Sequence, residues 1–522
     1  MKKFLSNTPF HPILFAIYPI IALFVVNIKE IRFEIIVRSL ILSALFALLI
    51  ILFLRLILKN WYKAAVVTSL FLILFFTYGH LYHYFQQRGF IFLARHRYLS
   101  LIFICLFLLF LWVALRKVKN YESLTLSLNS IGLILLIFPL IQIIVFSFSV
   151  TRDIKIVQNF LSDGEHVSQP AAEANQFPDV YYIVLDTYTR QDALLKDFNF
   201  DNSPFFGELR DMGFYVADCS RSNYSYTEAS MVATLNLNYL PALFASLQDR
   251  GMSSGEIWVL IKKSIVREEL ESIGYQTVAF QTDYKWSSFG DADVLLGLGN
   301  ATANSLVIKP FETMLIRSTA LLLLDDTIKK ISYQQMDISN HPFADHISLQ
   351  LFTLDQLSQV PSIPGPKFIF VHILIPHVPY VFNAEGDILT DPGYFSGNNS
   401  MAVNEDYLKK GYIGEVEFIN SRMLQIFSEI LDNSRIPPII VIHGDHGLRD
   451  DNRLEIFNAY YLPQNGKENL YSSISPMNSF RVIFDTYFGT HYGLLPDESY
   501  LTDDFSRQSP ETSPACMDMI GN

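Results

Sequence analysis

The chain has 522 residues, half of them hydrophobic, and its charge is divided very unevenly along the sequence. Residues 1–150 contain 14 Lys/Arg and 3 Asp/Glu, whereas the remainder contains 25 Lys/Arg and 48 Asp/Glu. So acidic a body argues against nucleic acid as a partner, because phosphate backbones attract basic surfaces. Three cysteines are too few for a disulfide scaffold, although Cys219 and Cys516 can pair if this part of the chain lies outside the cell.

Five apolar runs near the amino terminus are each close to the length of roughly 20 residues that crosses a bilayer. They cover residues 10–28, 35–57, 63–84, 99–115 and 127–149. We therefore predict a membrane domain of about five helices over residues 1–150. Basic residues are divided almost equally between the loops of the two sides, so they do not fix the orientation of the bundle. The runs are almost free of buried charge, which argues against a transporter or channel without excluding it.

A juxtamembrane linker is predicted over residues 151–178, beginning with a short amphipathic helix along the membrane surface. From residue 179 to 502, short apolar strands alternate with helical patterns, which predicts an α/β domain with a mainly parallel sheet. Strands are predicted at 180–185, 214–217, 275–280, 367–371 and 440–442, and helices at 256–273, 348–357 and 404–431, among others. Residues 503–522, rich in Ser, Pro and Asp, are predicted to form a disordered tail.

Two of the predicted strands end in residues of the kind that bind metals. Residues 180–185 run into Asp186, and residues 440–442 run into a Gly-Asp-His-Gly segment at 444–447. Ligands of open α/β sheets bind at the carboxyl ends of strands, so both ends are expected at one site. The two glycines would let the backbone turn sharply and approach a ligand closely. Taken alone, either segment also reads as a strand followed by an ordinary polar turn.

Two further segments are candidates for the same site. Thr227 follows a hydroxyl-rich loop and opens a predicted helix, where backbone N–H groups and the helix dipole favour an anion. A threonine at this position also caps helices routinely. His372 ends the strand at 367–371, and His377 follows five residues later. These imidazoles can bind a second metal, hold the oxyanion of a substrate or protonate a leaving group, or they can have a purely structural role. Of these roles, we predict substrate binding for both histidines.

Asp186, Thr227, Asp445 and His446 make an oxygen-rich set of four ligands suited to Mn²⁺ or Zn²⁺, while the imidazole disfavours Mg²⁺. A threonine hydroxyl is a weak nucleophile because it stays protonated at neutral pH, and coordination to a dication lowers its pKa. We predict that the Thr227 hydroxyl attacks phosphorus, expels an alcohol and gives a phosphothreonine that water or an acceptor alcohol cleaves. Neither GxxxxGK[ST] nor GxGxxG occurs, so nucleotide-driven chemistry is not supported.

Read in order, Val-Leu-Asp at 184–186, Thr227 after Ser-Asn-Tyr, His-x4-His-x-Pro-Tyr at 372–380 and Gly-Asp-His-Gly at 444–447 resemble the alkaline phosphatase/sulfatase superfamily. The layout of five spans, a linker and one such domain is similar to lipoteichoic acid synthases and lipid A phosphoethanolamine transferases. The resemblance implies a sulfatase-like fold for residues 179–502. It also implies Asp186, Asp445 and His446 as metal ligands, with Thr227 as a nucleophile that touches the metal.

The chain departs from these families at three places. The single-metal transferases usually have Glu as the first acidic ligand, so Asp186 is closer to phosphatases and sulfatases. Two-metal phosphatases carry Asp-x3-His before the Asp-His pair, and this chain has His372 in that region, which puts a second metal in doubt. Sulfatases need C/S-x-P-x-R to make formylglycine, and the segment 219–221 lacks the Pro and the spacing of the Arg.

The resemblance implies a multi-pass protein of the plasma (inner) membrane whose catalytic domain lies on the extracytoplasmic side. It implies metal-dependent transfer or hydrolysis of a phosphoester carried by a membrane lipid or an envelope glycan. Tethering to the bilayer favours a lipid-linked substrate, because it keeps the site close to the headgroups. Hydrolysis of sulfate esters, a catalytically silent sulfatase-like binding module and a transporter are the alternatives.

Overall fold

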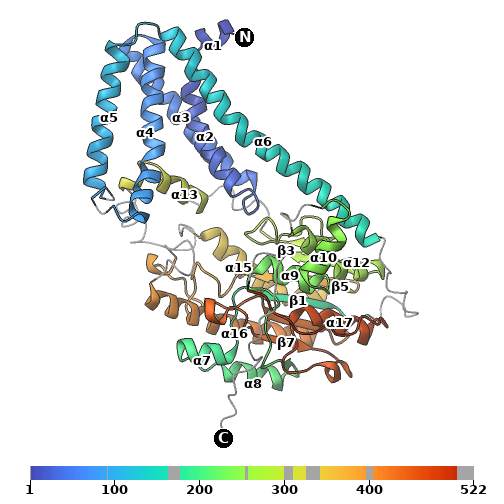
Figure 1. Ribbon diagram of the computed structural model, residues 1–522. Helices are drawn as coiled ribbons and strands as arrows, with labels where there is room; N and C mark the ends of the chain where they lie inside the picture. Colours follow the sequence, from blue (N-terminus) through green and yellow to red (C-terminus); the bar gives the residue numbers. More distant parts are fainter. Residues whose placement is uncertain are drawn as a thin grey trace. The chain divides into compact units, whose positions relative to one another are not determined.

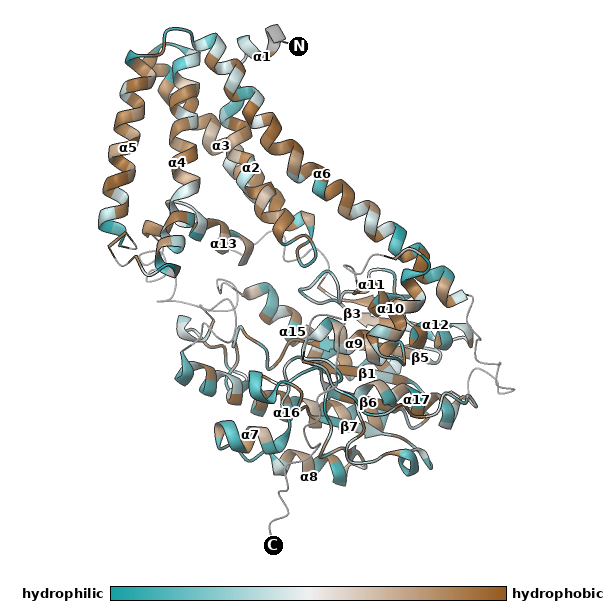
Figure 2. Cartoon of the chain, viewed as in Figure 1, coloured by the Kyte–Doolittle hydropathy of each residue, from teal (hydrophilic) through white to brown (hydrophobic). Residues whose placement is uncertain are grey.

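The computed structural model of the protein describes residues 2–90, 92–93, 95–162, 177–252, 257–298, 310–324, 341, 343–395 and 404–501. Most of the predicted linker beyond residue 162, the predicted tail and Cys516 lie outside the described residues. The chain forms two compact units, residues 1–148 with 305–342, and residues 149–304 with 343–522. Helices of the first unit are apolar along most of their length, whereas the second unit is built around a sheet (Figures 1 and 2).

The five apolar runs all form helices in the first unit. The helices before residue 163 are α1 (Lys2–Asn7), α2 (His11–Val26), α3 (Phe33–Leu58), α4 (Trp61–Gln87), α5 (His96–Arg116) and α6 (Tyr121–Ser162), and α6 belongs to the first unit as far as residue 148. Among the described residues, α3 to α6 are long and apolar enough to cross a membrane, whereas α2 has 16 residues and is shorter than a typical span. Helix α6 continues without a break through 42 residues, so the separate surface helix predicted after residue 150 is instead its carboxyl-terminal part.

A helix from the second half of the chain belongs to the membrane unit, which the sequence did not indicate. Helix α13 (Pro310–Ser318) packs against α3 and α4. The side chain of Glu312 forms an ion pair with Arg38 of α3, and Phe311 is buried among apolar residues of α2 and α3. Gly79 of α4 permits this packing, because a Cβ atom there would lie 2.1 Å from the carbonyl oxygen of Arg317. The predicted soluble domain is therefore interrupted by a segment that folds with the membrane helices.

The second unit contains a mixed, mostly parallel sheet of seven strands, which confirms the predicted fold class. In spatial order the strands are β2 (Tyr215–Val216), β7 (Asn458–Tyr461), β6 (Ile439–Gly444), β1 (Val180–Leu185), β5 (Lys367–Ile373), β3 (Gln276–Phe280) and β4 (Val294–Leu296). Strands β6, β1, β5, β3 and β4 run parallel, and β7 is antiparallel to both of its neighbours, β6 and β2. Every residue of β1, β5 and β6 is buried, as expected when helices cover both faces.

Helices pack on both faces of this sheet. They are α7 (Gln191–Phe198), α8 (Ser203–Asp211), α9 (Thr227–Leu235), α10 (Leu240–Gln248), α11 (Val259–Lys262), α12 (Ile265–Ser272), α15 (Ala344–Leu357), α16 (Glu405–Asn433) and α17 (Pro476–Tyr487), with 3₁₀ turns at Val360–Ser362, Pro392–Tyr394, Asp450–Asn452 and Gly466–Asn469. The core formed by alternate residues of β1 includes side chains of α7, α8, α15 and α16. On the opposite face the ring of Tyr182 packs 5.4 Å from Phe480 of α17. Successive strand residues thus serve opposite faces, as a pleated strand requires.

The single helix predicted over 256–273 is two helices within the described residues. Ser264 separates α11 from α12, and its hydroxyl accepts a hydrogen bond from the backbone N–H of Arg267. A serine side chain that satisfies a free N–H begins a new helix. An uninterrupted apolar pattern does not reveal such an internal cap.

Glu415 of α16 holds the chain segment that follows His377. Its Oε1 accepts hydrogen bonds from the backbone N–H groups of Val381 at 2.7 Å and Phe382 at 3.3 Å. The side chain is completely buried, and its Oε2 has no hydrogen-bond partner among the described residues. Burial raises the pKa of Glu415 well above its ordinary value of 4.5, although the two N–H groups oppose that shift.

We expect Glu415→Gln to stabilise the protein, increasingly so as the pH rises. The folded state binds a proton at Glu415 at pH values where the unfolded carboxylate has lost it, so this residue costs stability as the pH rises above about 4.5. Gln keeps an acceptor oxygen for the two N–H groups and does not ionise. Melting temperatures of the two proteins in detergent, measured from pH 5 to pH 9, should diverge toward pH 9. A constant difference across that range would contradict the assignment.

Candidate active site

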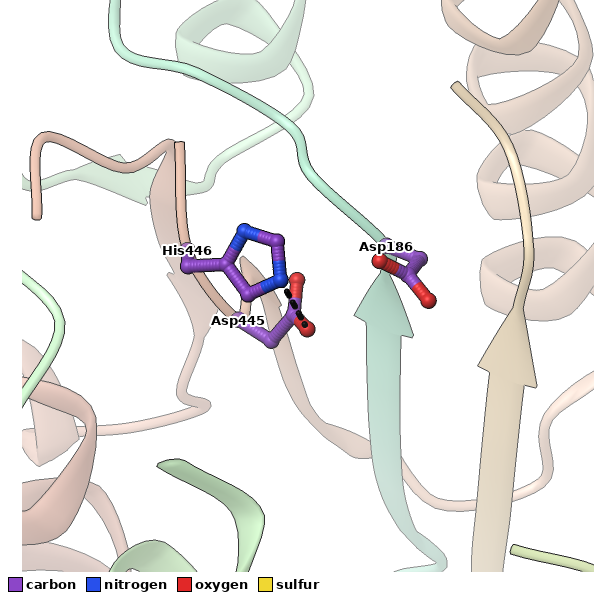
Figure 3. A group of neighbouring side chains, drawn as sticks. All are labelled: Asp186, Asp445 and His446. Carbon is purple, nitrogen blue, oxygen red and sulfur yellow. Dashed lines mark ion pairs between the residues drawn. The ribbon is translucent and has the colours of Figure 1, made fainter. Parts of the chain in front are cut away.

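The site lies at the carboxyl ends of three neighbouring parallel strands. Strand β1 is paired on one side with β5 and on the other with β6, so that Val184 lies opposite both His372 and His443. Asp186 follows β1 directly, and Asp445 and His446 follow β6. Figure 3 shows Asp186 at the tip of its strand, with Asp445 and His446 on the neighbouring chain segment. The pairing of parallel strands therefore brings residues 259 positions apart to one edge of the sheet.

Three of the predicted ligands form a compact cluster. Ligand atoms of Asp186, Asp445 and His446 all lie within 4.8 Å of one another, and the three residues are buried. Thr227, the first residue of α9, places its Oγ1 3.4 Å from Nε2 of His446. The four residues singled out in the sequence thus meet in space. Among the described residues, this cluster of Asp and His side chains is the one group with the geometry to hold a metal.

Hydrogen bonds to the backbone orient two of these side chains. Oδ1 of Asp445 accepts a hydrogen bond of 2.9 Å from the N–H of Thr187, whose φ of 61° is unusual for a residue other than glycine. Nδ1 of His446 lies 2.9 Å from the carbonyl oxygen of Gly447. That contact assigns the proton to Nδ1 and leaves a lone pair on Nε2, the atom that faces the cluster.

The unpartnered atoms of the cluster fit a cation. Oδ1 of Asp186 and Oδ2 of Asp445 are buried and have no hydrogen-bond partner among the described residues. Buried oxygens are nearly always satisfied, so two such atoms in one cluster require an explanation; Oδ2 of Asp445 lies 3.5 Å from Nε2 of His446. A divalent ion would satisfy all three at once, and histidine ligands typically donate their other N–H to a carbonyl, as His446 does.

Opposing effects set the protonation of these groups. Burial by itself would raise the pKa of Asp186, but the imidazoles of His377, His372 and His446 together lower it below its ordinary value. The pKa of His446 is lowered, chiefly by burial and further by Arg453, against the attraction of Asp445 and Asp186. An ionised carboxylate and a neutral imidazole are the forms that bind metals.

The two other predicted histidines lie beside Asp186. Nε2 of His372 is 3.3 Å from Oδ2 of Asp186, and the imidazole is buried with its ring 5.7 Å from that of Trp286. His377 is half-buried and places Nδ1 2.5 Å from the carbonyl oxygen of Val378. His372 therefore contacts the candidate ligand Asp186, whereas His377 is the more accessible of the pair.

Several positioning residues escaped the sequence analysis. The hydroxyl of Ser222 donates to the backbone oxygen of Asp445 at 2.5 Å, and its N–H donates to Leu454 at 2.7 Å. These bonds tie the loop before Thr227 to the segment after β6. Arg453 lies at the same junction, with Nη2 3.5 Å from Nε2 of His446. The sequence shows that the loop before Thr227 is rich in hydroxyl groups, but it does not indicate that Ser222 and Arg453 contact the segment around Asp445 and His446.

The two glycines of the 444–447 segment allow a close approach, but to the protein's own backbone. A Cβ atom on Gly444 would lie 2.2 Å from the carbonyl oxygen of Tyr188, and one on Gly447 would lie 2.2 Å from that of Asn452. Neither glycine has a positive φ. In the structure, these two positions therefore require glycine because the protein's own backbone packs against them, and a close approach to a ligand stays a prediction.

Comparison with known proteins gives weak matches. No protein-family model and no curated protein matches the chain. The matched structures include phosphoethanolamine transferases, a putative sulfatase and a phosphonate monoester hydrolase. One is the C-terminal periplasmic domain of EcEptC from Escherichia coli, a complex with Zn, at 13% identity and a TM-score of 0.36, covering 61% of this chain and 84% of that chain.

A second match extends over the helical unit as well. It is the integral membrane protein lipooligosaccharide phosphoethanolamine transferase A from Neisseria meningitidis, at 12% identity and a TM-score of 0.36, covering 92% of this chain and 94% of that chain. A third is a phosphonate monoester hydrolase from Silicibacter pomeroyi, at 13% identity and a TM-score of 0.36, covering 60% and 74%. Folds do not specify reactions, so the reaction must be inferred from the site.

Removing one carboxylate of the cluster should abolish metal binding and stabilise the metal-free protein. In Asp445→Asn the buried carboxylates no longer repel one another, so the metal-free melting temperature should rise. The stabilisation by added Mn²⁺ or Zn²⁺ should disappear with the site. Metal content by mass spectrometry and melting with and without chelator test both statements. Asp355→Asn, at an exposed ion pair with Arg422, is the matched control; a normal metal response in Asp445→Asn would contradict the assignment.

Gly444→Ala should destabilise the protein by about 1–3 kcal/mol, the usual cost of forcing an atom into a packed interior. The added Cβ would meet the backbone of Tyr188, which a side-chain movement cannot relieve. Gly207→Ala is the control, because no atom lies within 4 Å of its added Cβ. The melting temperatures of the two variants test this prediction. Equal melting temperatures would show that the backbone around Gly444 moves to accommodate a Cβ atom at little cost, and would contradict the prediction.

Proposed function

We propose that this protein is a membrane-anchored, metal-dependent phosphoester transferase or hydrolase whose nucleophile is Thr227. One observation supports the proposal above the others: Oγ1 of Thr227 lies 3.4 Å from Nε2 of His446, beside two buried carboxylates. A hydroxyl at the amino end of a helix, next to a preformed cation site, is placed for attack on an anionic ester.

Asp186, Asp445, His446 and Thr227 would hold the ion, for which Mn²⁺ and Zn²⁺ are the candidates. When bound, a dication supplies Lewis-acid stabilisation of phosphoryl charge and lowers the pKa of a nearby hydroxyl. A second ion has no comparable cluster among the described residues. The chain's own part is to hold the hydroxyl and the ligands in fixed positions, which Ser222 and Thr187 do through hydrogen bonds to Asp445.

In the proposed reaction, Oγ1 of Thr227 forms a bond to phosphorus as the bond from phosphorus to the ester oxygen breaks. The hydroxyl proton is lost, and the leaving alcohol gains one. Water then cleaves the phosphothreonine in a hydrolase, or an acceptor alcohol does so in a transferase. His377 is assigned to the substrate side because it is half-buried, and the buried His372 to the orientation of Asp186.

The segment that contains Cys219 favours phosphate over sulfate, because it lacks the Pro and the spacing of the Arg that C/S-x-P-x-R requires. The resemblance to lipid A phosphoethanolamine transferases is the reason for placing this unit outside the cytoplasm. Helices α3 to α6 provide the anchor, and a substrate carried by a membrane lipid or an envelope glycan would be presented beside it.

The test is turnover by the full-length protein in nanodiscs, loaded with Mn²⁺ or Zn²⁺, on an aryl phosphodiester and on phospholipid. Thr227→Ala should reduce the rate to the uncatalysed background, and Thr227→Ser should retain part of it because a hydroxyl remains. Rapid quenching and peptide mass spectrometry should find on Thr227 the phosphoryl group with the second ester substituent of the diester still attached. Thr486→Ala, on α17, is the control.

Two results would reject the proposal. If the wild type binds metal but is as inactive as Thr227→Ala on every ester, the unit is a silent binding module. If aryl sulfate is cleaved faster than aryl phosphate, the activity is that of a sulfatase. Lipid mass spectrometry of cells with and without the gene would then identify the donor and the acceptor.

A further inference from the structure

Arg453 is fixed between the nucleophile loop and the metal cluster. Its Nε donates a 2.8 Å hydrogen bond to the carbonyl oxygen of Ser225, two residues before Thr227. Its own carbonyl oxygen accepts a 2.7 Å hydrogen bond from the N–H of Gly447, next to His446. Both the backbone and the side chain of Arg453 are therefore tied to the segments that carry the reactive groups.

No carboxylate neutralises this guanidinium among the described residues. Other buried arginines of the same unit have acidic partners: Arg190 pairs with Asp192 at 2.6 Å and Arg267 with Glu271 at 2.6 Å. Arg453 is half-buried, and its guanidinium contacts only carbonyl oxygens and the imidazole of His446. A partly desolvated cation without a counter-charge is costly, so this position calls for an anion.

The contact between Arg453 and His446 would not persist if His446 held a metal ion. Nε2 of His446 has one lone pair, because Nδ1 carries the proton that faces Gly447. That lone pair lies 3.5 Å from Nη2 of Arg453. If that lone pair were given to a dication, Nη2 would lose this acceptor, and two positive charges would lie close together. A negatively charged oxygen between them removes both difficulties.

We propose that Arg453 binds a non-bridging oxygen of the substrate's phosphoryl group, through Nη2, and so aligns phosphorus with Oγ1 of Thr227. The inference rests on the function proposed above and adds the group that recognises the anion. Arginine suits the task because its charge persists at all relevant pH values and its planar fork matches phosphate oxygens. The substrate class is then an ester with at least one ionised phosphoryl oxygen, and neutral phosphotriesters should be poor substrates.

Binding of inorganic phosphate to the metal-loaded, full-length protein tests the proposal without requiring turnover. Arg453→Gln should weaken phosphate binding, measured by calorimetry, by roughly 10- to 100-fold, the effect expected for a hydrogen bond to a charged group. Arg453→Lys should recover part of the loss, because it keeps the charge. Metal content should stay at the wild-type value in both variants. Arg422→Gln, at the surface ion pair with Asp355, is the matched control.

Turnover separates this inference from the proposed function. In Arg453→Gln the KM for an aryl phosphodiester should rise more than for a matched phosphotriester, while Thr227→Ala should abolish turnover of both. Wild-type phosphate affinity in Arg453→Gln would overturn the role of Arg453 and leave the nucleophile untouched. Loss of metal in proportion to loss of phosphate would also overturn it, because it would show a structural role. Phosphate binding that depends on Arg453 in a protein without turnover would support the anion position and reject the nucleophile.

Discussion

The pairing of β1 with both β5 and β6 is the constraint on which the site depends. Because the three strands are parallel and in register, their carboxyl ends lie at one edge of the sheet. Their burial on both faces fixes that register, since a slip of one residue would turn every side chain to the wrong face. Asp186, His372 and the Asp445–His446 pair are therefore positioned by the sheet and not by flexible loops.

This arrangement concentrates negative charge where water is excluded. Two carboxylates, each with a buried oxygen that has no hydrogen-bond partner among the described residues, are held within a few ångströms, and the neighbouring imidazoles lower the pKa of Asp186 against the effect of burial. Burial of like charges is unfavourable unless a counter-charge joins them. The stability of this unit comes from the apolar core between the sheet and its helices. That core can offset the cost of two buried carboxylates that have no bound cation beside them.

The sequence predicted those parts of the site that depend on local pattern. Asp186 and Asp445 were recognisable because each follows an apolar strand, and Thr227 because it opens a helix. Ser222 and Arg453 were missed because their roles arise from contacts 223 and 228 positions away along the chain. The membrane unit divides in the same way. Apolar runs revealed its spans, whereas the docking of α13 on α3 and α4 depends on Gly79 and on an ion pair over 274 positions.

The residues of the site fall into two groups that differ in how deeply they are buried. Asp186, Asp445 and His446, the proposed metal ligands, are almost completely buried, and so is His372, which contacts Asp186. Thr227, His377 and Arg453 are half-buried. The roles proposed for them, as nucleophile, substrate-binding histidine and anion-binding group, all require contact with a substrate that enters and leaves, so partial exposure suits each of them. Under the proposed function, the half-buried residues would face the entering ester, and the buried residues would hold the charge on the opposite side.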